Sequence, residues 1–408
     1  MYDETTIGAR LRTLRRWRGM RLVDLAGQAG MSKTHLSDIE RGRKALDRRS
    51  YIAGLAAALR VSETDIVGGP HLTADPVQAG PHGAIPHLRM ALQTNSLDQP
   101  LCDRARPLTE LVAELGAIET MRVRCDYDAL GGLLPDVVDE LHVHTANPVD
   151  EAALGLALRA MVDACVTATH LASNLGYGDL AHLAARRAWE AAACLDEPVE
   201  KGKAAFVSVL TMPKVGSAGS WARSLTAAER AAAALSPHAV EPVGVQVLGM
   251  ITLTASLSAA AMNNHSSAAG WLDEAAELAA RVPDRPTSAW MQFSATNVGV
   301  WRVGIGVESG ESGRAVAELA QRVDETRLEG VGSRRASFLA DVGRGLARDR
   351  GTRDLAVRYL RRAENVAPQR IRNDARVRET VAVLLQQATS SAGGRELRGM
   401  AARMGVPH

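Results

Sequence analysis

The feature that most restricts the fold of this chain is an internal repeat in its second half. Similar segments begin at Gly178, Gly219, Asn264, Glu311 and Gly351, between 40 and 47 residues apart. Each carries small residues, mainly Ala, where two helices would cross closely, and each follows another helical segment across a short turn. A helical pair of this kind buries its apolar face only against neighbouring pairs, so the repeat predicts a stacked array of helical pairs with a concave inner surface.

The composition also favours helices over strands. Of the 408 residues 46% are hydrophobic but only 3% are aromatic, and Ala, Leu, Arg and Glu dominate, which are residues with high helix propensity. Apolar residues recur at helical spacing between residues 85 and 144, where Pro107 and Pro135 are expected to interrupt the helices. We therefore expect an all-α protein.

Glycine and proline residues divide the chain into regions. Short amphipathic segments precede residue 67, near 6–18, 22–29, 33–41 and 50–60, and the stretch from Gly68 to Gly83 cannot form a continuous helix. Residues 1–69 hold 13 Lys and Arg against 8 Asp and Glu, whereas acidic residues outnumber basic ones in the remainder. The expected organisation is a basic helical domain (1–67), a linker (68–83), a helical connecting region (84–147) and a helical repeat domain (148–408).

The segment Leu22–Gly42, with the sequence LVDLAGQAGMSKTHLSDIERG, has the features of two short helices joined by a tight turn. Ala26 is small enough to let the second helix approach, Gly30 supplies the turn, and Ser32 is placed to cap the helix that follows. Leu36 and Ile39 bury on one face of that helix, and Gly42 ends it.

This pattern resembles the helix-turn-helix of the Xre family, the repressors related to phage Cro and cI. The resemblance implies that the helix after Ser32 lies in the major groove and that flanking residues contact phosphates. It also implies an orienting pair between Arg15 and Glu40. The implied base-contacting residues are Lys33, Thr34, Ser37 and Asp38, and the implied phosphate-contacting residues are Arg21, His35, Arg41, Arg43 and Lys44.

Two of these assignments have alternatives. Asp38 can accept a hydrogen bond from a cytosine amine, but it can equally be a solvated or helix-pairing carboxylate. Many relatives carry Gln at the position of Leu22 to hold a phosphate, so we expect the neighbouring Arg21 to take over that contact.

The repeats resemble tetratricopeptide-type repeats, although their period exceeds the roughly 34 residues of that motif. A domain of Xre type followed by such an α-solenoid resembles bacterial regulators whose repeats dimerise and bind a signal, short peptides among them. The resemblance implies a homodimer on a double-stranded DNA operator, controlled by a small-molecule or short-peptide effector. The alternatives are an adaptor whose repeats recruit another protein, and an enzyme with a DNA-binding head.

Tryptophan residues mark a candidate effector site. The chain has six tryptophans, and five of them lie in the repeats. Trp290, Phe293, Asn297 and Trp301 are spaced so that they would share one face of a helix. Such a face can bind a ligand through aromatic rings and the amide, or it can be part of the core with Asn297 satisfied by the backbone.

Other features argue against metal, cofactor and membrane roles. The four cysteines stand apart, and His142 and His144 would point in different directions on a helix, so no metal site is expected. The sequence has no P-loop, no GxSxG motif and no glycine-rich nucleotide signature, so we expect neither a cofactor nor catalysis. We expect no apolar run long enough to cross a bilayer, and the first residues are acidic, which predicts a cytoplasmic protein.

Overall fold

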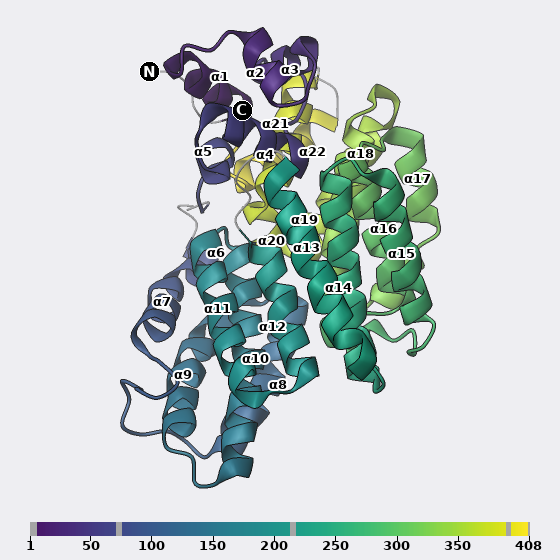
Figure 1. Ribbon diagram of the computed structural model, residues 1–408. Coiled ribbons are helices and arrows are strands. Elements are labelled where there is room, and N and C mark those ends of the chain that lie inside the picture. Colours follow the sequence, from purple (N-terminus) through teal and green to yellow (C-terminus); the bar gives the residue numbers. More distant parts are fainter. Residues whose placement is uncertain (1–5, 71–75, 213–217, 389–392, 407–408) are drawn as a thin grey trace.

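The computed structural model of the chain describes residues 6–70, 76–212, 218–388 and 393–406. In these ranges the secondary structure is helical, apart from one isolated antiparallel bridge between Ser96 and Gln99. An N-terminal domain of short helices lies at one end of an array of longer helices (Figure 1). The all-α prediction, with a helix-turn-helix domain followed by helical repeats, is therefore confirmed.

The N-terminal domain has a hydrophobic core of its own, built from side chains such as Leu11, Leu25, Leu36 and Leu55. The four predicted segments appear as helices within about two residues of their expected limits, and a fifth short helix follows them. The helices are α1 (Ile7–Trp17), α2 (Leu22–Gln28), α3 (Lys33–Glu40), α4 (Arg49–Leu59) and α5 (Glu63–Val67).

The connecting region differs from its prediction in two respects. Part of the expected linker is helical, because α6 spans Pro76–Gly83, while residues 71–75 lie outside the described residues. Pro135 does not interrupt its helix: it is buried within α9, where packing of the surrounding apolar residues outweighs the loss of one backbone hydrogen bond. The helices that follow are α7 (Ile85–Thr94), α8 (Leu108–Arg124) and α9 (Tyr127–Ala146).

The repeat region consists of helical pairs, and the five similar segments of the sequence are the second members of these pairs. The pairs are α10 (Glu151–Asn174) with α11 (Gly178–Leu195), α12 (Pro198–Thr211) with α13 (Ala218–Leu235), α14 (Pro242–Ala261) with α15 (His265–Ala279), α16 (Ala295–Ser309) with α17 (Gly313–Gln321), and α18 (Gly332–Ala347) with α19 (Arg353–Val366). The chain continues as α20 (Pro368–Asn373), α21 (Ala375–Gln387) and α22 (Gly393–Arg403).

The first helices of these pairs form a closed inner row together with α8. In the order α8, α10, α12, α14, α16 and α18, each helix contacts the next, and α18 also contacts α8. Gly332, at the start of α18, lies so close to the end of α8 that a Cβ atom there would be 3.4 Å from the carbonyl oxygen of Arg124. The array therefore closes into a ring within a single turn instead of extending as an open superhelix.

Two of the inner helices are long and apolar enough to span a bilayer by length and composition, which the sequence reading did not anticipate. In α10 and α14, 61% and 89% of the apolar window is buried inside the protein. Because both helices contact neighbours in the ring, their apolar character is that of core helices.

Candidate nucleic-acid interface

The local geometry of α3 agrees with the helix-turn-helix pattern of the sequence. Gly30 has a φ of +69°, which permits the tight turn after α2, and the Ser32 hydroxyl accepts a hydrogen bond from the His35 N–H at 3.1 Å. Leu36 and Ile39 are fully buried, which fixes the rotation of the helix about its axis. As a result Lys33 and Thr34 are exposed at the start of α3, and Ser37 is half-buried one turn later.

The predicted pair between Arg15 and Glu40 is present and bidentate. Arg15 Nε and Nη2 donate to the two carboxylate oxygens of Glu40 at 2.6 and 2.8 Å, and Arg12 donates to the Glu40 carbonyl oxygen at 2.6 Å. The hydrogen bond to Glu40 raises the pKa of the Arg15 guanidinium, although burial opposes this change. Because Arg15 lies in α1 and Glu40 ends α3, the pair fixes the orientation of the two helices.

The Asp38 carboxylate is directed toward two cations of the loop after α3. Its oxygens lie 3.3 Å from Lys44 Nζ and 3.9 Å from an Arg43 guanidinium nitrogen, and its carbonyl accepts the N–H of Arg43 at 2.7 Å. Asp38 therefore has partners in the free protein. A base that approached Asp38 would share its carboxylate with Lys44 or displace that lysine.

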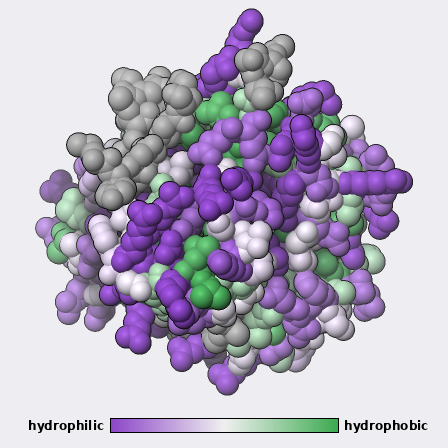
Figure 2. Space-filling model, turned by 90° about the horizontal axis from the view of Figure 1, so that it is seen from above, coloured by the Kyte–Doolittle hydropathy of each residue, from purple (hydrophilic) through white to green (hydrophobic). Residues whose placement is uncertain are grey.

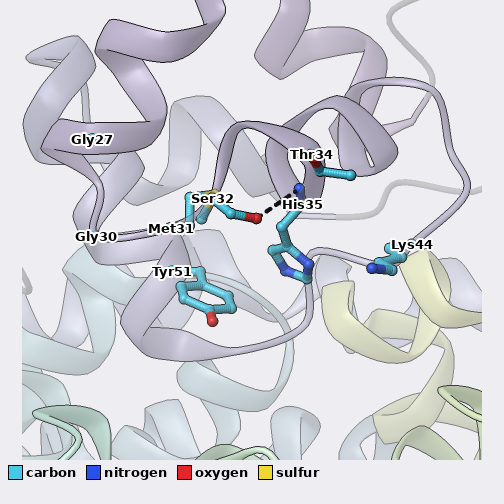
Figure 3. A pocket seen from close by; sticks show the side chains of 8 residues that line it. All are labelled: Gly27, Gly30, Met31, Ser32, Thr34, His35, Lys44 and Tyr51. Atoms are coloured by element: carbon cyan, nitrogen blue, oxygen red, sulfur yellow. Dashed lines mark hydrogen bonds between the residues drawn. The ribbon is translucent and has the colours of Figure 1, made fainter.

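A recess of about 580 Å³ lies beside the start of α3 (Figure 3). The ring of His35 packs at 5.3 Å from that of Tyr51, and Lys44 lies at the other side of His35 (Figure 3). Burial, and the nearby charge of Lys44, lower the pKa of His35, so that its imidazole is neutral at pH 7. The recess is lined by Gly27, Gly30, Met31, Ser32, Thr34, His35, Lys44 and Tyr51.

The residues predicted to contact phosphates differ in their exposure and in their ion-pair partners. Arg21 is exposed but donates to both oxygens of Asp24, at 2.8 and 2.9 Å, so its charge is already paired. Arg41 is exposed after the end of α3, and Arg43 and Lys44 lie in the loop that follows, with more than half of each side chain exposed. Arg21, Arg43 and Lys44 are thus exposed cations that each have a carboxylate nearby, Asp24 or Asp38, in the free protein.

Sequence reasoning missed the contact between the helix-turn-helix domain and the far end of the chain. Asp47, before α4, accepts hydrogen bonds from Arg348 at 3.0 and 3.1 Å and lies 3.6 Å from the buried Arg344. Arg49 donates to Glu308 at 2.6 Å, and Glu308 also lies 3.3 Å from Arg376. Burial acts to raise the pKa of Glu308, but the guanidinium groups of Arg49, Arg344 and Arg376 outweigh it and lower this pKa to about 2. Partners separated by more than 250 residues leave no local signal in the sequence.

A second part of this contact involves α21. The Glu379 carboxylate accepts the backbone N–H of Ile7 at 3.2 Å and that of Leu46, and Gln387 Nε2 donates to the Arg43 carbonyl at 2.5 Å. These contacts attach the start of α1 and the loop before α4 to the end of the repeat array, next to α21 and α22 (Figure 1). The exposed residues of α3 stay accessible in this docked arrangement.

The prediction that the aromatic residues and Asn297 share one face of a single helix is wrong. Met291 and Gln292 have φ values of +48° and +61°, and α16 begins only at Ala295, so Trp290 and Phe293 precede the helix. Phe293 and Asn297 are fully buried, and Phe293 packs on Gly249 of α14. Asn297 Nδ2 makes only long contacts, to the Met291 carbonyl at 3.5 Å and the Met250 sulfur at 3.7 Å. Trp290 and Trp301 are half-buried.

Comparison with known families supports the assignment of the N-terminal domain. Residues 6–66 match the family model described as "Helix-turn-helix domain", and these limits agree with α1–α5. No curated protein and no solved structure matches the chain. The N-terminal domain is thus a helix-turn-helix domain, a class of DNA-binding module that occurs in transcriptional regulators.

Proposed function

We propose that the protein is a sequence-specific transcriptional regulator of Xre type that binds a double-stranded operator as a homodimer in the cytoplasm. The observation that carries this proposal is the exposed start of α3, with Lys33 and Thr34 accessible while the domain is docked on the repeats. Viewed from the helix-turn-helix end, the surface is largely hydrophilic (Figure 2), as a surface that meets a phosphate backbone requires.

In this proposal Lys33, Thr34 and Ser37 contact base edges, with Asp38 joining them where a cytosine amine replaces Lys44. Arg41, Arg43 and Lys44 hold phosphates, Arg21 can do so after release from Asp24, and His35 can add a neutral hydrogen bond. One helix-turn-helix domain covers only one half-site of an operator. Two half-sites about one helical turn apart are needed for useful specificity, and for this reason we propose a homodimer.

The repeats, of tetratricopeptide type in this proposal, bind the effector that controls DNA binding. Trp290 and Trp301 are its aromatic contacts, and Phe293 and Asn297 support them from the core. The closed inner row favours a small ligand over a folded protein partner, because α8 to α18 contact one another as a ring and not as an open concave groove. The docked contact through Asp47, Glu308 and Glu379 gives the repeats a rigid connection to the DNA-binding domain.

The test begins with selection of binding sites for the purified full-length protein from random double-stranded DNA, followed by footprinting. Lys33→Ala and Thr34→Ala are each expected to weaken binding to the selected site by roughly 1–3 kcal/mol, about 5–150-fold, with unchanged helicity. Lys201→Ala, at a half-buried lysine of α12 that pairs with Asp196, is the control and should bind as the wild type does. If the Lys33 and Thr34 variants both footprint as strongly as the control, α3 is not the recognition helix.

A further inference from the structure

The inner row of helices gathers a set of cationic and aromatic side chains that no part of the helix-turn-helix function explains. Phe206 of α12 packs at 6.2 Å from His170 of α10 and at 5.5 Å from Trp290. Arg334 of α18 lies over the ring of Trp301 of α16, with 5.7 Å between the guanidinium carbon and the ring centroid. Four of these residues belong to helices of the ring, and Trp290 lies in the segment that precedes α16.

Arg334 and Arg370 form the cationic part of this set, which we call the arginine pair. In the described part of the chain, neither guanidinium has a hydrogen bond or an ion pair to a carboxylate. Both side chains are half-buried. Burial acts to lower the pKa of Arg370, but nearby groups, among them the carboxylates of Asp374 and Asp341, outweigh it and raise that pKa. Burial and the neighbouring charges of Arg370 and Arg122 lower the pKa of Arg334 to about 9. A charged group that is closely surrounded by protein but retains accessible surface is one that a solvent-borne ligand can reach.

The carboxylates near the arginine pair are engaged elsewhere. Asp341 and Asp374 act on Arg370 through their charge, but Asp341 accepts from Arg344 at 2.7 Å and Asp374 accepts from Arg376 at 2.9 Å. Glu119 forms two hydrogen bonds with the buried Arg122, at 2.5 and 2.6 Å. Among the described residues, no carboxylate near the arginine pair therefore bonds directly to either guanidinium, and both groups stay available to an anion.

The remaining polar atoms in this region are also able to donate. His170 Nε2 and Trp301 Nε1 are buried and lack a hydrogen-bond partner among the described residues. Burial, together with the charges of Arg122, Arg334 and Arg370, keeps the pKa of His170 well below its ordinary value, so its ring is neutral at pH 7. A neutral imidazole can still donate one hydrogen bond.

We propose that the interior of the ring binds a small organic anion, with its oxyanion held by Arg334 and Arg370 and its apolar or aromatic body against Trp301, Trp290 and Phe206. The shared chemistry is an oxygen acid, either a carboxylate or a phosphate ester, because only such a group meets two guanidinium forks and additional donors. This inference rests on the proposed effector role of the repeats and names the chemical class of that effector.

Calorimetric titration of the full-length protein tests the inference with defined probes. Phenyl phosphate and benzoate present the two oxyanions on an aromatic body, inorganic phosphate lacks the body, and benzylamine reverses the charge. At least one aromatic anion should bind saturably with one site per chain, more tightly than inorganic phosphate, and benzylamine should not bind. Arg334→Gln and Arg370→Gln should each weaken that binding at least tenfold, whereas Arg302→Gln, an arginine beside Trp301 that pairs with Asp273, should leave it unchanged.

The unliganded variants give a second readout. Neither arginine forms an ion pair with a carboxylate in the described part of the chain, so its replacement should leave the melting temperature close to that of the wild type. A variant that fails to fold or melts much earlier would show that the arginine is structural, and the proposal would then be wrong. It would also be wrong if neither aromatic anion bound, or if both variants bound as the wild type does. No DNA enters these measurements, so their failure is distinguishable from a failure of operator binding.

Discussion

The contact between Glu379 and the helix-turn-helix domain predicts an unusual dependence of stability on pH. Glu379 is only 4% exposed, and it accepts backbone N–H groups from Ile7 and Leu46. Burial is the largest influence on this carboxyl and raises its pKa from 4.5 to about 7. The perturbation that tests this is Glu379→Gln, which removes the titrating group and keeps a carbonyl oxygen that can accept an N–H.

The sign follows from proton binding. Between pH 4.5 and pH 7 the folded protein holds the Glu379 proton and the unfolded chain releases it, so the free energy of unfolding falls as the pH rises through this window. One pKa unit corresponds to 1.36 kcal/mol, so the full effect is at most roughly 3 kcal/mol at pH 8. The Gln side chain cannot titrate, and any cost of its amide is independent of pH.

Urea unfolding of the wild type and of Glu379→Gln at pH 5 and pH 8 measures this effect. From pH 5 to pH 8 the wild type should lose up to about 3 kcal/mol more of its free energy of unfolding than the variant does. Asp354→Asn, on the exposed side of α19, serves as the control and should show no such change. A variant-to-wild-type difference that is the same at pH 5 and pH 8 would refute the reasoning.

Three further outcomes are expected. Asp47→Asn replaces the carboxylate that pairs with Arg348 and with the buried Arg344. In thermal melts the free energy of unfolding should fall by roughly 1–3 kcal/mol. An unchanged stability would show that the docked contact does not form in solution. Arg43→Ala should weaken binding to all DNA sequences alike and reduce the slope of log affinity against log salt by about 0.9, whereas a loss confined to the operator would contradict a phosphate contact. Asn297→Ala should lower the free energy of unfolding by about 1–3 kcal/mol, because a buried donor is lost and a cavity is left. Binding of the anionic probe should stay as in the wild type. Unchanged stability with weaker probe binding would instead place Asn297 in the ligand site.

The sequence predicted what depends on local spacing. The turn at Gly30, the cap at Ser32 and the second helix of each pair are all determined by neighbouring residues, and the structure contains them. The pair between Arg15 and Glu40 was available only through the resemblance to a known motif. The aromatic face failed because two residues with positive φ, Met291 and Gln292, separate Trp290 from α16, and periodicity carries no information about such a break.

The contact between the helix-turn-helix domain and the repeats, and the arginine pair, could not be predicted from the sequence for a different reason. Glu308 meets Arg49 across 259 residues, and Arg334 meets Trp301 only because α16 and α18 are neighbours in the ring. On the sequence alone, the many arginines between Arg334 and Arg378 fit solvated helix faces, since Asp and Glu residues are interspersed among them. Which of them lack a partner is decided by tertiary packing.

The contact that closes the inner row has a consequence for how the chain folds. An open array of helical pairs can grow by addition of one pair to the next, and its folding depends mainly on contacts between near neighbours in the sequence. Here α8 must meet α18, and more than 200 residues separate Arg124 from Gly332. Ring closure thus adds contacts of very long range, which slow folding and couple the first repeats to the last. During synthesis α8 must wait for α18, so a chain truncated before Gly332 would leave uncovered the face of α8 that contacts α18.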